Sequence, residues 1–287
     1  MLADAIRAET WRLVHNRTTV FWSALFLPVI GVVMAVIGNT VMKSGAARMT
    51  VQGDVPPQLA QMLTGGPVRV IEEIISSVGE MANPAVLLFM LIGAAALYSG
   101  DYRWETWRLI SARNSRTNLI LGKVATLGLL ALAAMIALLA GEIAEVFIKA
   151  MVLERPVSWA VDANAAGRFA ALFGLSWLAI MQFTLVALLA AVTTRSLLAA
   201  MFVPIVVGAV QTLSPQGLAA MGIEPDAWIA VLINPGLGFS LLQAWVSGAS
   251  GLPDQAVMKA LATVGLWLVW PLAAALALFQ RQDLSKE

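Results

Sequence analysis

The chain has 287 residues, of which 60% are hydrophobic and 12% charged, and its mean hydropathy is +0.82. A water-soluble domain of this size could not cover several apolar runs of bilayer length, so the composition predicts a polytopic membrane protein. The absence of cysteine excludes disulfides, thiolate metal ligands and cysteine nucleophiles. The net charge of +1 gives no reason to expect a nucleic-acid partner. We expect no secretory signal, because Asp4 and Glu9 interrupt the first 17 residues.

Six apolar segments approach the roughly 20 residues that a spanning helix needs. None of them alternates polar with apolar residues as a barrel strand would, so they are predicted to be helices. The fold class expected is therefore all-α, with one transmembrane domain covering 1–287. The predicted spans are Val20–Met42, Ala82–Ser99, Asn118–Gly141, Phe169–Val192, Ser196–Leu213 and Leu261–Phe279.

The N-terminal segment, 1–19, combines apolar side chains with Arg7, Arg12 and Arg17 directly before the first span. This pattern is typical of an amphipathic helix lying on the inner membrane surface, and such a helix could also serve only as a topology anchor. His15 is the sole histidine, so no His-based metal site can form. In the first outer loop, Val68–Val78 is amphipathic and is expected at the outer interface.

A dense polar segment, residues 98–123, separates the second and third spans. A short, basic, Trp-bearing loop between spans is expected on the cytoplasmic side, and it suits contact with a soluble partner. The spacing of Asp101, Glu105 and Arg108 predicts a short helix capped by Ser99-Gly100-Asp101. The alternative is a solvated loop whose charges only enforce topology. The candidate contact residues are Asp101, Tyr102, Arg103, Trp104, Glu105, Thr106, Trp107, Arg108, Arg113 and Arg116.

Ionisable residues follow the third span at helical spacing. Glu142, Glu145 and Lys149 share one helical face, and they are candidates for the lining of an outer exit because charges near membrane depth are often functional. The alternative is that they only pair with one another and meet water at the helix end.

Residues 214–260 allow two topologies. Ala227–Val246 is apolar enough for a seventh span, but Asn234-Pro235-Gly236 interrupts it, because Pro lacks an N–H donor and Gly favours turns. We expect two half-helices that re-enter the outer leaflet.

The distribution of charge supports six spans with both termini inside. The inner segments then hold 11 Lys/Arg against 6 Asp/Glu, and the outer segments hold 7 against 11. Basic residues are concentrated in short inner loops, as the positive-inside rule requires. The expected location is the inner (cytoplasmic) membrane.

Known catalytic motifs do not fit. Gly248-Ala249-Ser250-Gly251 matches an intramembrane serine-protease motif, but the only histidine lies at the opposite side. No metalloprotease or P-loop motif is present, so ATP cannot bind by that route. We expect no enzymatic activity and no cofactor in this chain.

The polar segment resembles the permease subunits of ABC-2-type exporters, in which the second span ends G-E-(Y/F)-x-x-G-T-(L/W)-R and S-R-x-x-(L/I)-L-G-K follows. There are two departures: Glu105 replaces a glycine and Asn114 replaces a frequent proline. Both departures lie in the predicted contact helix. The matching residues are Gly100, Asp101, Tyr102, Thr106, Trp107, Arg108, Ser115, Arg116, Leu121, Gly122 and Lys123.

The resemblance implies a six-span exporter subunit with an N-terminal elbow helix, a coupling helix at 100–114 within the loop 100–117, and re-entrant helices before the last span. It further implies a cytoplasmic ATPase partner that binds the ATP, and a second permease copy or a homologous permease. Cargo and the choice between homodimer and heterodimer stay open; an amphipathic small molecule, a lipid or a peptide would suit the apolar bundle. The alternative function is a non-transporting membrane anchor or assembly factor, and an intramembrane enzyme ranks below it.

Overall fold

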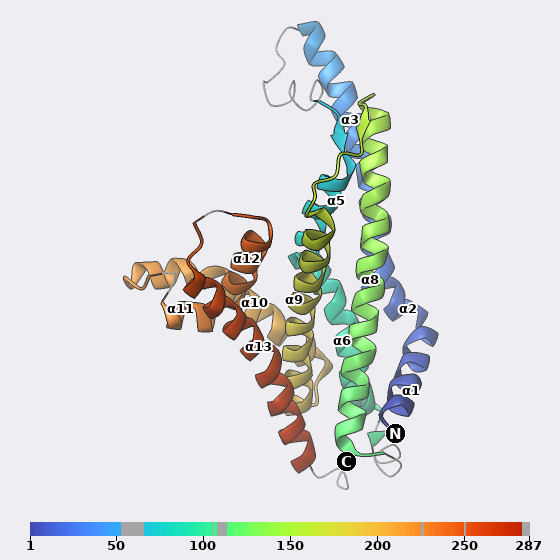
Figure 1. Ribbon diagram of the computed structural model, residues 1–287. Coiled ribbons are helices and arrows are strands. Elements are labelled where there is room, and N and C mark those ends of the chain that lie inside the picture. The colour runs from blue at the N-terminus through green and yellow to red at the C-terminus, as the bar shows by residue number, and fades with distance from the viewer. Residues whose placement is uncertain (53–65, 105, 108–113, 225–226, 250, 283–287) are drawn as a thin grey trace.

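The computed structural model describes residues 1–52, 66–104, 106–107, 114–224, 227–249 and 251–282. Within these ranges six helical segments are long and apolar enough to cross a bilayer (Figure 1), which confirms the six predicted spans. Each span is longer than its predicted apolar run, by 2 to 13 residues, because the helices continue beyond the ends of those runs. The spans are Arg17–Gly45, Pro84–Arg103, Arg116–Val152, Ala165–Thr194, Leu197–Ala220 and Asp254–Arg281.

Residues 2–52 form a nearly continuous run of helix. It consists of α1 (Leu2–His15), α2 (Arg17–Val20), a π-helical turn η1 (Phe21–Leu25) and α3 (Phe26–Gln52). Asn16 separates α1 from α2, and its side chain accepts a hydrogen bond from the Thr19 N–H. The π-helical turn has no signature in the hydrophobic pattern and was not predicted; its i→i+5 bonding shifts the register of the chain at the entry to the first span.

The three central spans are α6 (Pro84–Arg103), α8 (Arg116–Val152) and α9 (Ala165–Thr194). In the most apolar stretch of α9, 72% of residues are buried, against 11% in the first span. The outlying spans α10 (Leu197–Ala220) and α13 (Asp254–Arg281) are also mostly uncovered. Their apolar faces need a bilayer or another chain to cover them.

Sequence-coded caps set where the spans begin. The Asn83 side chain accepts from Val86 N–H with Pro84 in the first turn, and the Ser115 and Ser196 side chains cap α8 and α10 in the same way. At the end of α9, Arg195 adopts a left-handed conformation (φ 56°), which stops the helix before α10. The three side-chain caps each accept a hydrogen bond from a backbone N–H group for which lipid offers no acceptor.

A small structure joins the two loops at the far end of the bundle. Strand β1 (Val68–Arg69) pairs in parallel with β2 (Val157–Ser158), and α5 (Val70–Gly79) follows β1. Val70, Ile75 and Val78 are buried, so the apolar face of α5 is covered by this chain, and the position of Val68–Val78 at the outer interface stays a prediction. The amphipathic pattern is real, but α5 packs beside α8 and α9.

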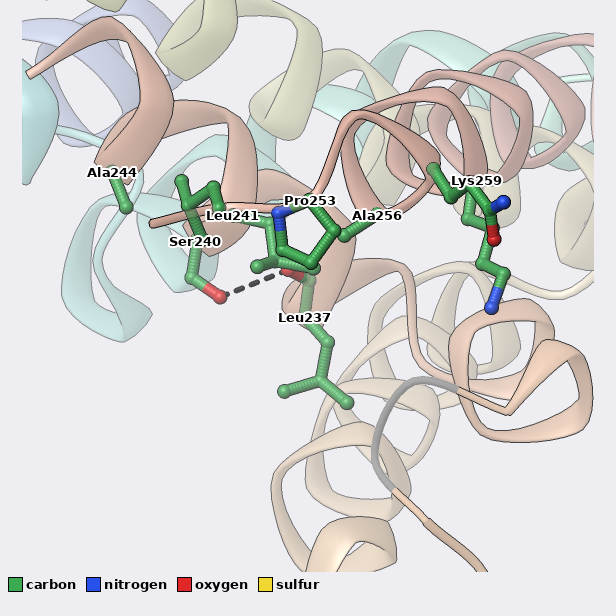
Figure 2. Close-up of a pocket in the computed structure, with 9 residues that line it drawn as sticks. Leu237, Ser240, Leu241, Ala244, Pro253, Ala256 and Lys259 are labelled. Atoms are coloured by element: carbon green, nitrogen blue, oxygen red, sulfur yellow. Dashed lines mark hydrogen bonds between the residues drawn. The ribbon is translucent and has the colours of Figure 1, made fainter. Parts of the chain in front are cut away.

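The predicted break in 214–260 is present. Helix α11 (Trp228–Ile233) ends at Asn234, and α12 (Pro235–Val246) begins directly after it, so Ala227–Val246 is not one spanning helix. The Asn234 side chain is buried; it caps α12 and donates to the Gln211 carbonyl of α10. A cleft of about 410 Å³ lies between α12 and α13, with Ser240 on one wall and Lys259 on the other (Figure 2).

Both ends of the described chain lie at the same end of the bundle (Figure 1). Asn114 Nδ2 donates to the Met1 carbonyl over 2.8 Å, while Arg116 Nη1 donates to the Gln282 carbonyl over 2.7 Å. An even number of crossings is the arrangement that produces this, in agreement with the six spans.

Candidate functional site

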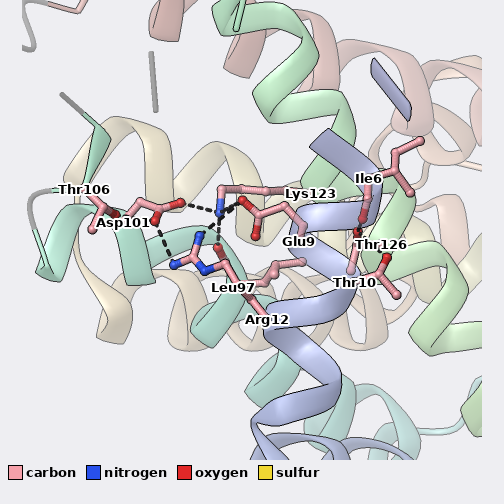
Figure 3. A network of polar contacts seen from close by, with 9 residues as sticks. All are labelled: Ile6, Glu9, Thr10, Arg12, Leu97, Asp101, Thr106, Lys123 and Thr126. Carbon is pink, nitrogen blue, oxygen red and sulfur yellow. Dashed lines mark hydrogen bonds and ion pairs between the residues drawn. The ribbon is translucent and has the colours of Figure 1, made fainter. Parts of the chain in front are cut away.

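Four ionisable residues meet where α1, α6 and α8 join (Figure 3). Glu9 and Arg12 come from α1, Asp101 from the end of α6, and Lys123 from the second turn of α8. Asp101 is fully buried, Lys123 is 1% exposed and Glu9 4% exposed, whereas the Arg12 side chain reaches the surface. We call these four residues the charge cluster.

The two bases of the charge cluster bridge its two acids. Lys123 Nζ lies 2.5 Å from Asp101 Oδ2 and 3.0 Å from Glu9 Oε1. Arg12 Nη2 donates to Asp101 Oδ1 over 2.9 Å, and Arg12 Nη1 lies 3.4 Å from Glu9 Oε1. The formal charges therefore cancel, and each acid contacts both bases.

Neutral groups complete the shell around Lys123 and Asp101. Lys123 Nζ donates to the Leu97 carbonyl over 2.9 Å, and Thr106 Oγ1 donates to Asp101 Oδ1 over 2.5 Å. The Trp107 ring lies 5.3 Å from Lys123 Nζ, close enough for a cation–π contact. The turn that follows α6 therefore closes over the charge cluster.

The same turn reaches the last span. Trp107 is 1% exposed, and its ring packs against Phe279 of α13 with centroids 4.5 Å apart. Tyr102 donates its hydroxyl to Gln282 Oε1 over 2.9 Å, and Arg116 donates to backbone carbonyls at the end of α13. The polar segment thus holds α1, α6, α8 and α13 together.

Close packing positions α1 on α8. A Cβ built on Gly122 would lie only 2.9 Å from the Ala5 Cβ and 3.2 Å from the Ala5 carbonyl carbon, so any larger residue would push the helices apart. One turn further along, Thr10 and Thr126 share a hydrogen bond of 3.2 Å between their hydroxyls. These contacts hold Glu9 against Lys123.

Water is largely excluded from the charge cluster, so the attraction between its opposite charges is stronger than it would be at a surface. For the same reason, leaving any one of these charges unpaired costs more free energy than it would at a surface. Burial opposes the charge on Arg12, but the hydrogen bond and negative charge of Asp101 outweigh it and raise the pKa of the guanidinium above its ordinary value. The arrangement offers no nucleophile with an adjacent base. Among the described residues no three His, Asp or Glu side chains are grouped to hold a metal ion.

The structure corrects part of the predicted contact helix. Ser99–Asp101 do not cap a new helix; they lie in the last turns of α6, which continues to Arg103. Asp101, Tyr102 and Trp107 are buried inside this chain, so they are not an exposed contact surface. The pattern of charge and aromatic residues could not distinguish an outward from an inward face.

Other predicted residues of the segment are exposed at the surface. Trp104 is 70% exposed and Arg103 lies over its ring at 5.4 Å, so these two face outward beside the charge cluster. Asn114, which replaces the proline of the resembled motif, bonds the N-terminus of α1 as described above. Glu105, Arg108 and Arg113 lie outside the described residues.

Glu142, Glu145 and Lys149 lie in the far half of α8. Lys149 Nζ donates to Glu73 Oε1 of α5 over 2.8 Å, and Glu145 sits against Gly31 of α3. Counting 1.5 Å per residue, about 20 residues of α8 from Lys123 cross the roughly 30 Å bilayer core and reach Glu142. The three residues therefore lie at and beyond the far edge of the core, where Lys149 helps to attach α5.

Sequence reasoning missed Glu9 and Arg12. The available signal was the position of Glu9, which follows Ala5 and precedes Leu13 by one turn each on the buried side of α1. A buried carboxylate requires a partner of opposite charge. In the sequence, the candidate for that partner was Lys123, a basic residue inside a span.

Comparison with known proteins identifies no relative: no family model matches the chain, and neither a curated protein nor a solved structure matches it.

Proposed function

We propose that this protein is the membrane-spanning permease subunit of an ATP-binding-cassette exporter. It moves an amphipathic small molecule, lipid or peptide outward across the cytoplasmic membrane, and a separate cytoplasmic ATPase binds and hydrolyses the ATP. Two permease chains, identical or homologous, form the membrane part of the assembly. Both termini and the Arg103–Trp104 turn face the cytoplasm, as the charge distribution favours.

The observation that carries this proposal is the position of the charge cluster directly behind the exposed Arg103–Trp104 turn. Burying ion pairs is not an efficient way to gain stability, since apolar residues of similar volume often do as well. Charges inside a membrane bundle point to function instead. A partner that displaces the turn would shift α1, α6 and α8 together, because Asp101, Glu9 and Lys123 join them.

Two further elements have roles in this proposal. Helix α1 acts as the elbow helix, with its outward Trp11 and Val14, which are 64% and 61% exposed, in the inner headgroup layer. Helices α11 and α12 form the re-entrant pair in the outer leaflet, and Asn234 supplies the hydrogen bonds that the broken backbone needs there.

The test is the double variant Arg103→Ala, Trp104→Ala, purified from native membranes through an affinity tag. The wild-type chain should retain a P-loop ATPase, and the variant should lose most of it, because exposed Trp and Arg anchors dominate docking energies. Correct insertion should persist in the variant, since Arg113, Arg116 and Arg195 still mark the inner side.

A matched control is Trp159→Ala. Trp159 is 59% exposed, beside β2 at the opposite end of the bundle, so its loss removes similar apolar surface without touching the turn. ATPase retention equal in the wild type, the double variant and the control would refute docking at this turn. If no ATPase accompanies the wild type, the anchor function is favoured.

A further inference from the structure

The cleft between α12 and α13 has one apolar wall, which α12 supplies (Figure 2). Leu237, Leu241 and Ala244 of α12 line the cleft, and the hydroxyl of Ser240 between them donates to the Leu237 carbonyl of its own helix over 3.0 Å. The volume of the cleft, about 410 Å³, lies within the range of about 300 to 1,000 Å³ that is usual for small-molecule sites. The α12 wall therefore suits the apolar part of a ligand.

The α13 wall supplies hydrogen-bond donors. Gln255 and Lys259 both line the cleft, and they lie on the same face of α13 because they are four residues apart. Lys259 Nζ lies 5.7 Å from the centre of the Trp228 ring of α11, close enough for a cation–π contact. Lys259 has a further contact within this chain, and the three N–H donors of an ammonium let it keep these contacts and also bind an acid group.

Charge selects the head of the ligand. Among the described residues that line the cleft, Lys259 carries the only formal charge, and Asp254 at the start of α13 is not one of them. An acid group beside Lys259 would meet an opposite charge next to apolar surface, where the attraction is stronger than in water. An uncharged head would form neutral hydrogen bonds, which are roughly half as strong as charge-assisted ones.

The cleft lies at the opposite side of the membrane from the charge cluster. Phe279 of α13 packs on Trp107 beside that cluster, and 20 residues of helix at 1.5 Å each place Lys259 about 30 Å away, the thickness of the bilayer core. A Cβ on Gly238 would lie 3.4 Å from the Ala260 carbonyl, so α12 and α13 touch there and the cleft extends from this contact toward the 247–253 connection. An amphiphile at the membrane edge can therefore reach it.

We propose that this cleft binds an amphiphile with an acid head, either a carboxylate or a phosphate. The acid head lies on α13 beside Gln255 and Lys259, and the alkyl chain packs against Leu237, Leu241 and Ala244 of α12. Binding to the chain alone does not depend on the proposed export function.

The test uses the full chain in phosphatidylcholine nanodiscs, without ATPase or ATP. The probe is decanoate with a diazirine in its alkyl chain, and photolabelling should fall on peptides 237–244 and 252–259. Unlabelled decanoate or decyl phosphate should compete, and the stronger of the two identifies the head group. Decyl glucoside, which has no charge, should compete about ten-fold less. Lys259→Gln should weaken decanoate binding about ten-fold, the value of one hydrogen bond to a charged group, and Lys259→Arg should retain most of the binding.

Lys43→Gln is the matched control, because Lys43 is an exposed lysine that does not line the cleft. Ala256→Trp should abolish labelling at an unchanged unfolding temperature, because the ring fills the cleft. The proposal would be overturned if decyl glucoside competed as well as decanoate, or if Lys259→Gln were labelled as strongly as the wild type. Labelling spread over the exposed faces of α3 and α10 would also overturn it, because that is the pattern of lipid around the bundle. Failure here leaves ATPase docking at Trp104 intact, and failed docking leaves this binding intact.

Discussion

Replacing Lys123 with Met tests the charge cluster. Met fills a similar volume but removes the ammonium group that contacts Asp101 and Glu9 at 2.5 and 3.0 Å. Arg12 alone then faces two buried carboxylates. Removing one partner of a buried ion pair costs about 3 to 5 kcal/mol. For a chain of this size that corresponds to a fall of about 6 to 10 °C in the unfolding temperature.

The double variant Lys123→Met, Asp101→Asn restores neutrality, because Glu9 and Arg12 remain as a pair. It should recover about 1 to 3 kcal/mol relative to the single variant, a coupling typical of residues in one network. Lys43→Met is the control, because Lys43 Nζ lies 2.6 Å from Glu154 Oε1 but both side chains are exposed. The unfolding temperature of this variant should match that of the wild type. Scanning fluorimetry in nanodiscs measures all three. The pairing in the charge cluster would be refuted if Lys123→Met had the wild-type unfolding temperature, or if the double variant unfolded at a lower temperature than Lys123→Met.

Three further outcomes are expected. Gly122→Ala should lower the unfolding temperature, because the added methyl group forces α1 away from α8. Gly100→Ala should leave the unfolding temperature unchanged, because there is open space around Gly100. Equal effects of the two changes in fluorimetry would contradict the close packing of α1 on α8. Asn234→Leu should cost about 1 to 3 kcal/mol in unfolding experiments by leaving its partners in α10 unsatisfied, and a neutral result would count against the buried break. In this cysteine-free chain, Thr194→Cys should react with impermeant maleimide only from the cytoplasm and Ser247→Cys only from outside; the reverse pattern would overturn the orientation.

Much of the fold could be predicted because bilayer-length apolar runs leave little choice. The six spans and the break at Asn234 followed from length, hydropathy and one Pro-Gly pair. The pattern could not show what covers each apolar face: Val68–Val78 is amphipathic, and its apolar face packs on α8 and α9. Periodicity shows that a helix has an apolar side, but it cannot say whether lipid or protein covers it.

The site could be predicted only in part for a related reason. The charges of segment 98–123 were expected to face a partner, whereas Asp101, Trp107 and Lys123 face inward. Their partners Glu9 and Arg12 are about 90 residues away in sequence from Asp101, and no local pattern links the two segments.

The central claim is ATP-driven export, and the most direct test is transport by inside-out membrane vesicles that contain the chain and its co-purified ATPase. The account predicts that an amphipathic small molecule, lipid or peptide accumulates inside the vesicles when ATP is supplied, and that accumulation is lost when either the ATPase or ATP is omitted. Accumulation that does not depend on ATP, or ATP hydrolysis by the intact assembly with no movement of any amphiphile, would contradict it.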